Sequence, residues 1–135
     1  MAHVLIPVTA PDAAQRAVIA LLAEPRDPHL MVELLALVEP RRPGKVRMFV
    51  SEAQARAQVE SAARRWLAPL EAMLSAAHVS FSSTVLLGPV RASLRQAVAR
   101  AGIDRVLLPA PEGGFISRRE HARVTALAAH PVTVA

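Results

Sequence analysis

The residues best suited to bind a ligand lie near the carboxyl end of the chain. Gly113 and Gly114 precede Ser117 and Arg118 there, and a helical pattern begins at the serine. Adjacent glycines let backbone N–H groups approach a phosphate, and a hydroxyl with cations at a helix amino terminus attracts an anion. These residue types at this spacing are therefore consistent with a site for a small anion.

The same residues also have an interpretation that needs no ligand. Ser117 and Glu120 have the Ser-x-x-Glu spacing of a capping box, in which each side chain accepts the other residue's backbone N–H. Gly113 and Gly114 would then be a loop hinge. We prefer the capping box, because its pattern is complete and a glutamate at this point would repel a phosphate.

The sequence contains no complete catalytic motif and no recognisable set of metal ligands. Ser117 and His121 are one helical turn apart, but no carboxylate or oxyanion donor completes a nucleophilic site and no Gly-x-Ser-x-Gly motif surrounds the serine. The absence of cysteine excludes thiolate metal sites. The histidines lack metal-ligand spacing as well: they are His3, His29, His78, His121 and His130. We predict neither an enzyme nor a metal protein, and no catalytic residue is nominated.

Composition limits the possible partners. The 135 residues suit one domain spanning residues 1–135, and 16 basic against 11 acidic residues give a net charge of +5. The arginines are scattered and aromatic residues are few, so we expect no specific nucleic-acid site. The basic loop containing Arg41, Arg42, Lys45 and Arg47 remains the candidate for weak nucleic-acid association. No apolar run approaches the ~18 residues of a membrane span, and no signal peptide is recognisable, so a cytoplasmic protein is expected.

Hydrophobic patterning predicts strands that alternate with helices. The expected strands are His3–Val8, His29–Val38, Val79–Leu87, Ile103–Leu108 and Pro131–Ala135. The expected helices are Asp12–Leu22, Ser51–Ala77, Val90–Ala101 and Ser117–Ala129. Alternation of this kind favours an α/β fold with a doubly wound, open, five-stranded parallel sheet and helices on both faces.

Three local features refine this prediction. Val79–Leu87 alternates apolar and polar residues, which is typical of a strand at the edge of a sheet. Pro69 predicts a kink in the long second helix, or a break near Ala68. Gly102 stands where a left-handed residue ends a helix.

Several segments in this order resemble the universal stress protein family over nearly the whole chain. They are the opening strand ending in Pro7-Val8, the Gly88-Pro89 turn, the segment Gly102–Leu108 and the ending Ala129–Val134. The resemblance implies a flavodoxin-like sheet with strand order 3-2-1-4-5 and a homodimer in which the last strands pair. It also implies a crevice where the first and fourth strands end, in which many members of the family bind ATP or AMP.

The nucleotide motif of the family is largely missing. Members that bind nucleotide carry an aspartate after the first strand, where this chain has Thr9. They carry Gly-x-x-Gly after the fourth strand, where this chain has Pro109-Ala110-Pro111-Glu112. Two prolines remove two N–H donors and fix φ, and Glu112 adds negative charge where phosphate would lie. The nucleotide-binding site is therefore expected to be degenerate.

The leading hypothesis is a non-catalytic, dimeric stress-response protein without the family's ATP site, with no cofactor, acting through contact with an unidentified protein partner. The alternative is a sensor of ATP, AMP or a small anion that uses an altered site of Thr9, Gly113, Gly114, Ser117 and Arg118. A second alternative is weak association with nucleic acid through the basic loop. These hypotheses differ in the ligand that each predicts.

Overall fold

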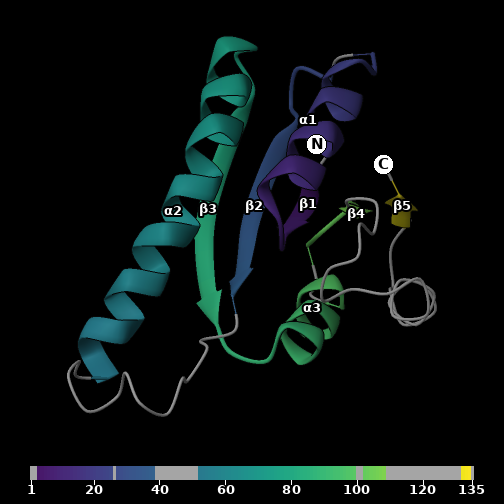
Figure 1. Cartoon of the computed structure of the whole chain (residues 1–135). Coiled ribbons are helices and arrows are strands. Elements are labelled where there is room, and N and C mark those ends of the chain that lie inside the picture. The colour runs from purple at the N-terminus through teal and green to yellow at the C-terminus, as the bar shows by residue number, and fades with distance from the viewer. Residues whose placement is uncertain (1–2, 26, 39–51, 100–101, 109–131, 135) are drawn as a thin grey trace.

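The structure is a computed structural model that describes residues 3–25, 27–38, 52–99, 102–108 and 132–134 (Figure 1). Its strands are β1 (His3–Val8), β2 (Met31–Val38), β3 (Ser80–Leu87), β4 (Arg105–Leu108) and β5 (Val132–Val134). Its helices are α1 (Pro11–Leu22), α2 (Glu52–Ala76) and α3 (Val90–Val98). The predicted helix Ser117–Ala129 and the predicted basic loop around Arg41 lie outside the described residues.

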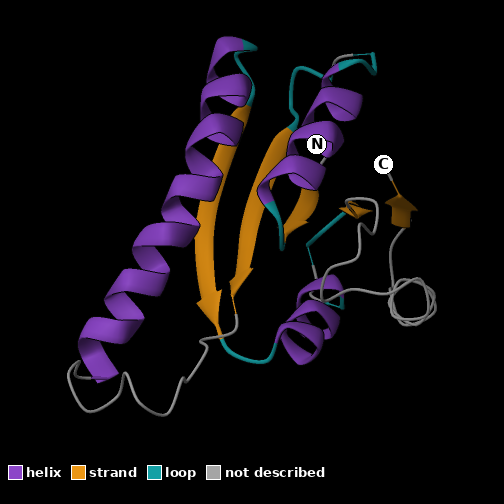
Figure 2. Cartoon of the chain, in the orientation of Figure 1, coloured by secondary structure: helices purple, strands orange, loops and turns teal. Residues whose placement is uncertain are grey.

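The strands form a parallel sheet in which β3, β2, β1 and β4 lie side by side in that order (Figure 2). β1 pairs with β2 from His3 opposite Met31, and with β4 from Val4 opposite Arg105. The chain thus winds outward to β3 and returns across the sheet to β4, which confirms the predicted doubly wound order of these four strands. The short strand β5 pairs in parallel with β4.

Helices cover both faces of the sheet, as predicted. Alternate residues of a strand point to opposite faces, so the central strands contribute to two separate cores. Val4, Ile6 and Val8 of β1 pack with α1 and α2 in one core. Leu5 of β1 packs with Leu94 of α3 in the other. β1 is buried on both sides because it lies in the middle of the sheet, and its near-continuous apolar sequence reflects that position.

The edge position predicted for Val79–Leu87 is confirmed. β3 ends the strand order, and its residues alternate between exposed and half-buried along the whole strand. The half-buried residues Phe81 and Val85 pack against the core under α2. Leu86 lies on the other face of the strand and is 40% exposed.

The course of α2 tests the break predicted from Pro69. The helix runs without interruption through Pro69, so the predicted break near Ala68 is wrong. Pro69 is exposed, whereas Ala63, Leu67 and Leu70 are fully packed, and their burial offsets the hydrogen bond that proline removes.

Two residues in the left-handed backbone conformation lie between a helix and the strand that follows it. His78, with φ of 58°, follows α2, and Val79 donates its N–H back to the Leu74 carbonyl, which satisfies a free carbonyl at the helix end. Gly102 has φ of 87°, so the predicted left-handed conformation is confirmed, although α3 already ends at Val98.

Two strands begin later than predicted because their first residues form turns. His29 donates its N–H to the Asp27 carboxylate and Leu30 donates to the Asp27 carbonyl, so β2 starts at Met31. Asp104 makes two hydrogen bonds with His3, accepting its N–H and donating to its carbonyl, before β4 starts at Arg105.

In the part of the chain that the structure describes, no helix combines the length and the apolar character that a membrane span requires.

Candidate functional site

The strand order reverses between β1 and β4, so the carboxyl ends of these two strands are the place where the crevice is expected. Thr9 follows β1 directly and is half-buried. Ala10 is the extended residue before α1, and it makes no side-chain capping bond. The crevice therefore receives an uncharged hydroxyl residue from β1 instead of a carboxylate.

The other residues of the altered site are not placed by the structure. Gly113, Gly114, Ser117 and Arg118 lie outside the described residues, as does the segment 109–112 that replaces the family's glycine motif. The geometry at this end is thus defined by Thr9 and the start of α1. Asp12, exposed in the first turn of α1, complements the positive end of the helix dipole.

At the opposite end of the sheet, an ion pair joins the segment after α1 to the start of β4. Arg105 Nη1 donates to Glu24 Oε2 at 2.6 Å, and Arg105 Nη2 donates to Glu24 Oε1 at 2.7 Å. This two-bond geometry fixes the orientation of both planar groups. The Arg105 side chain is 26% exposed and the Glu24 side chain is 42% exposed, so the pair lies at the surface.

The two charges stabilise each other's ionised forms. The hydrogen bond from Arg105 lowers the pKa of the Glu24 carboxyl, aided by the guanidinium charge and opposed by partial burial. The hydrogen bond to Glu24 raises the pKa of Arg105. Both groups are therefore ionised at neutral pH.

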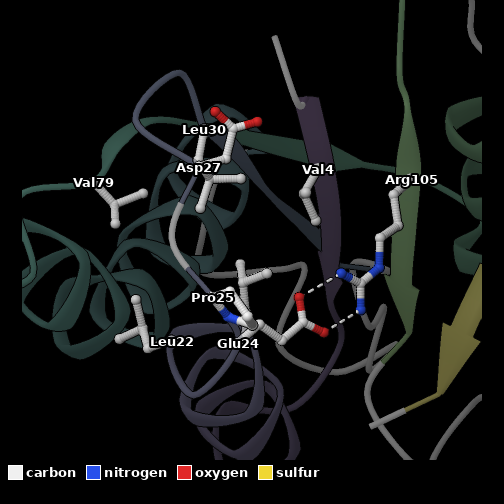
Figure 3. A pocket seen from close by; sticks show the side chains of 9 residues that line it. Val4, Leu22, Glu24, Pro25, Asp27, Leu30, Val79 and Arg105 are labelled. Carbon is white, nitrogen blue, oxygen red and sulfur yellow. Dashed lines mark hydrogen bonds and ion pairs between the residues drawn. The ribbon is translucent and has the colours of Figure 1, made fainter.

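A hollow of about 120 Å³ lies beside this ion pair (Figure 3). Its floor is mainly aliphatic, and the polar side chains come from the segment after α1 and from β4. The lining residues are Val4, Leu21, Leu22, Glu24, Pro25, Asp27, Leu30, Val79 and Arg105. This hollow could not be predicted from the sequence, because its residues come from several segments and Glu24 is 81 positions from Arg105.

A contact between a histidine and a carboxylate lies on the face of the sheet covered by α3. His3 Nε2 is 3.3 Å from Glu33 Oε2, and Glu33 is only 8% exposed. Within the described residues Glu33 is the one buried charged residue, and no group of three or more side chains there could hold a metal ion. His3 thus takes part in a structural contact.

Comparison with solved structures identifies the fold. A universal stress protein family member from Burkholderia pseudomallei superposes with a TM-score of 0.72 at 17% identity, covering 99% of this chain and 95% of that one. A family member from Arabidopsis thaliana with AMP bound gives 0.72 at 17% identity, covering 99% and 90%. The chain has the universal stress protein fold. A universal stress protein in complex with cAMP shares it, with a TM-score of 0.63 at 14% identity and coverage of 99% and 96%.

Sequence comparison alone does not reach this result. No family model matches the chain, and no curated protein matches it either. The recognition of a universal stress protein pattern from short segments is nevertheless confirmed by these structures, which share the fold over nearly their whole length. At such low identity the likeness extends to the fold, and ligands must be argued from the residues.

Proposed function

We propose that this chain is a divergent member of the universal stress protein family, a non-catalytic cytoplasmic protein that acts through protein contacts and lacks the family's ATP site. The proposal combines the shared fold with the residues at the crevice. The observation that carries it is Thr9, which lies at the carboxyl end of β1 where a nucleotide-binding member has aspartate. Pro109, Pro111 and Glu112 support it from the sequence, since they reduce the donors available to phosphate.

Nucleotide titration tests this proposal directly. Calorimetry and thermal shift with ATP, AMP and cAMP should show no binding tighter than about 1 mM, because a ligand that binds the native state raises its stability with concentration. A saturable stabilisation below that concentration would overturn the proposal.

A restored variant provides the matched control. Thr9→Asp combined with Pro109→Gly and Glu112→Gly returns the aspartate and both glycines of the family motif. Because these changes supply a carboxylate for the nucleoside and backbone donors for phosphate, we expect nucleotide affinity to rise by at least tenfold, or about 1.4 kcal/mol. No gain in this variant would mean that the substitutions at these positions are not what prevents binding.

The altered nucleotide or anion site is the second candidate, and the neighbours that hold AMP and cAMP favour it. In this proposal Thr9, Gly113, Gly114, Ser117 and Arg118 contact the ligand. Ser117→Ala and Arg118→Ala should then each abolish a ligand-induced thermal shift, while Ser82→Ala on the far edge strand should preserve it. A shift that survives both changes would exclude this site.

We further propose a homodimer through β5, completing a five-stranded 3-2-1-4-5 sheet in each protomer. The support is that β5 is short, is β-prone and lies at the end of the strand order, where unpaired backbone groups favour pairing. Sedimentation at tens of micromolar should give a dimer. Thr133→Asp should dissociate it by placing like charges near the two-fold axis, whereas Ser82→Asp on β3 should not.

A further inference from the structure

The hollow beside Glu24 and Arg105 is a site of different character from the crevice. Leu30, Val79 and Arg105 all lie at the amino ends of their strands or directly before them, whereas Thr9 follows the carboxyl end of β1. Val4 and Thr9 are separated by roughly 16 Å along an extended strand. A ligand in the hollow would therefore be independent of any nucleotide in the crevice.

The shape and lining of the hollow suit a small apolar group. The aliphatic lining residues that keep accessible surface are Leu22 and Leu30, which are half-buried, and Pro25, which is exposed. An enclosed apolar protein cavity of about 150 Å³ takes up benzene, so by volume alone a hollow of about 120 Å³ has room for a branched chain of a few carbons. Burial of that chain supplies the apolar part of the binding free energy.

Arg105, which lines the hollow, is already bound to a carboxylate. Its guanidinium holds the Glu24 carboxylate through two parallel hydrogen bonds, the geometry with which arginine also binds free carboxylates. Figure 3 shows both groups beside the aliphatic lining, so that a carboxylate on Arg105 and an alkyl group in the hollow are adjacent.

Glu24 can be replaced on Arg105 at small cost. The Glu24 side chain is 42% exposed and regains water when it leaves. Exposed pairs of this kind change an equilibrium constant by only about two- to fivefold. The internal carboxylate is thus a weak competitor for an incoming one.

From these observations we propose that the hollow binds small branched aliphatic monocarboxylates. The ligand's carboxylate replaces Glu24 on Arg105, and its alkyl group packs against Leu22, Pro25 and Leu30. The neighbouring Asp27 side chain, which already accepts the His29 N–H, disfavours ligands with a second negative charge.

The test uses the intact chain labelled with ¹⁵N and titrated with 3-methylbutanoate. Saturable amide shifts are expected at Val4, Leu22 and Arg105, with a dissociation constant on the order of millimolar. Acetate lacks the alkyl group and 3-methylbutanamide lacks the charge, so each should give at least fivefold weaker responses.

Variants separate this mechanism from nonspecific attraction. Glu24→Gln should tighten binding by about two- to fivefold by removing the competitor, and Arg105→Gln should abolish it. Asp12→Asn, a matched loss of an exposed carboxylate at the other end of the molecule, should leave the affinity unchanged. Amide spectra of each variant without ligand report that the fold is retained.

Two outcomes would overturn the proposal. The first is that neither the native chain nor Glu24→Gln shows saturable amide shifts when the 3-methylbutanoate concentration is raised to about 50 mM, roughly 50-fold above the expected dissociation constant. The other is equal binding of the acid and its amide, which would assign the hollow to neutral apolar molecules. Neither outcome bears on nucleotide binding, which is measured separately at the crevice.

Discussion

At the scale of single residues, the Glu24–Arg105 pair is the best-defined polar contact between distant segments. It joins Glu24, which follows α1, to the first residue of β4 at the edge of the hollow. Because both side chains are partly exposed, its effect on stability is limited by solvent.

The pair predicts a pH-dependent stability difference. The pKa of Glu24 is lowered in the folded state, so its contribution is complete above the unfolded carboxyl pKa and disappears as the pH falls through the folded pKa. Glu24→Gln should lower the free energy of unfolding by about 0.2–1 kcal/mol at pH 7. Urea titrations should show the two proteins converging as the pH falls through the lowered pKa of Glu24; a constant difference would contradict the assignment.

At the scale of elements, α2 contains a proline, a residue that disfavours the helical conformation. Pro69 lies inside a continuous helix of 25 residues and is exposed. The helix persists because Leu67, Leu70 and Leu74 are fully buried against the sheet, so tertiary packing outweighs the local preference.

Replacing this proline should stabilise the protein. Pro69→Ala restores an N–H donor to the helix and relieves the clash with the preceding turn, and we expect a gain of about 1–3 kcal/mol, less the entropy that the unfolded chain regains. Thermal and urea unfolding measure the change. Ala72→Gly at a neighbouring exposed position is the control, with an expected loss of about 1 kcal/mol. A destabilised Pro69→Ala protein would indicate that the proline makes a favourable contact.

His78, in the turn that follows α2, leads to a second prediction at this scale. His78 has a left-handed backbone, which costs a side-chain-bearing residue energy that glycine avoids. His78→Gly should therefore raise the free energy of unfolding by about 0.5–1 kcal/mol, even though glycine has more entropy when unfolded. A loss of stability, measured by the same unfolding experiments, would mean that the imidazole makes a contact worth more than the strain.

At the scale of the whole molecule, two cores lie on opposite faces of one sheet. Leu94 of α3 is fully buried against Leu5 and Leu35, so this helix closes its face through a few large side chains. Leu94→Ala should cost about 2–5 kcal/mol, whereas Leu86→Ala on the edge strand should cost less than about 1 kcal/mol. Comparable losses in calorimetry would contradict the two-core arrangement.

Local sequence pattern was sufficient for the elements that the structure describes and for their order along the chain. The continuous apolar run of β1, the alternation of β3 and the alternation of strands with helices each reflect a periodicity that burial imposes on neighbouring residues. Thr9 could also be placed from sequence, since it follows a strand whose end was recognisable. The exact starts of β2 and β4 could not be predicted from sequence, because the residues expected to begin these strands form turns around Asp27 and Asp104 instead.

Tertiary structure alone decided which distant residues meet. No periodicity links Glu24 with Arg105 or His3 with Glu33, because each pair depends on strand register and on the path of a turn. The uninterrupted course of α2 through Pro69 was decided in the same way, by burial of leucines on the opposite side of the helix. Sequence by itself was sufficient to predict the fold and to show which residues stand after the first and fourth strands. Packing across the sheet determined the hollow and its ion pair, since side chains far apart in the chain come together only when the strands lie side by side.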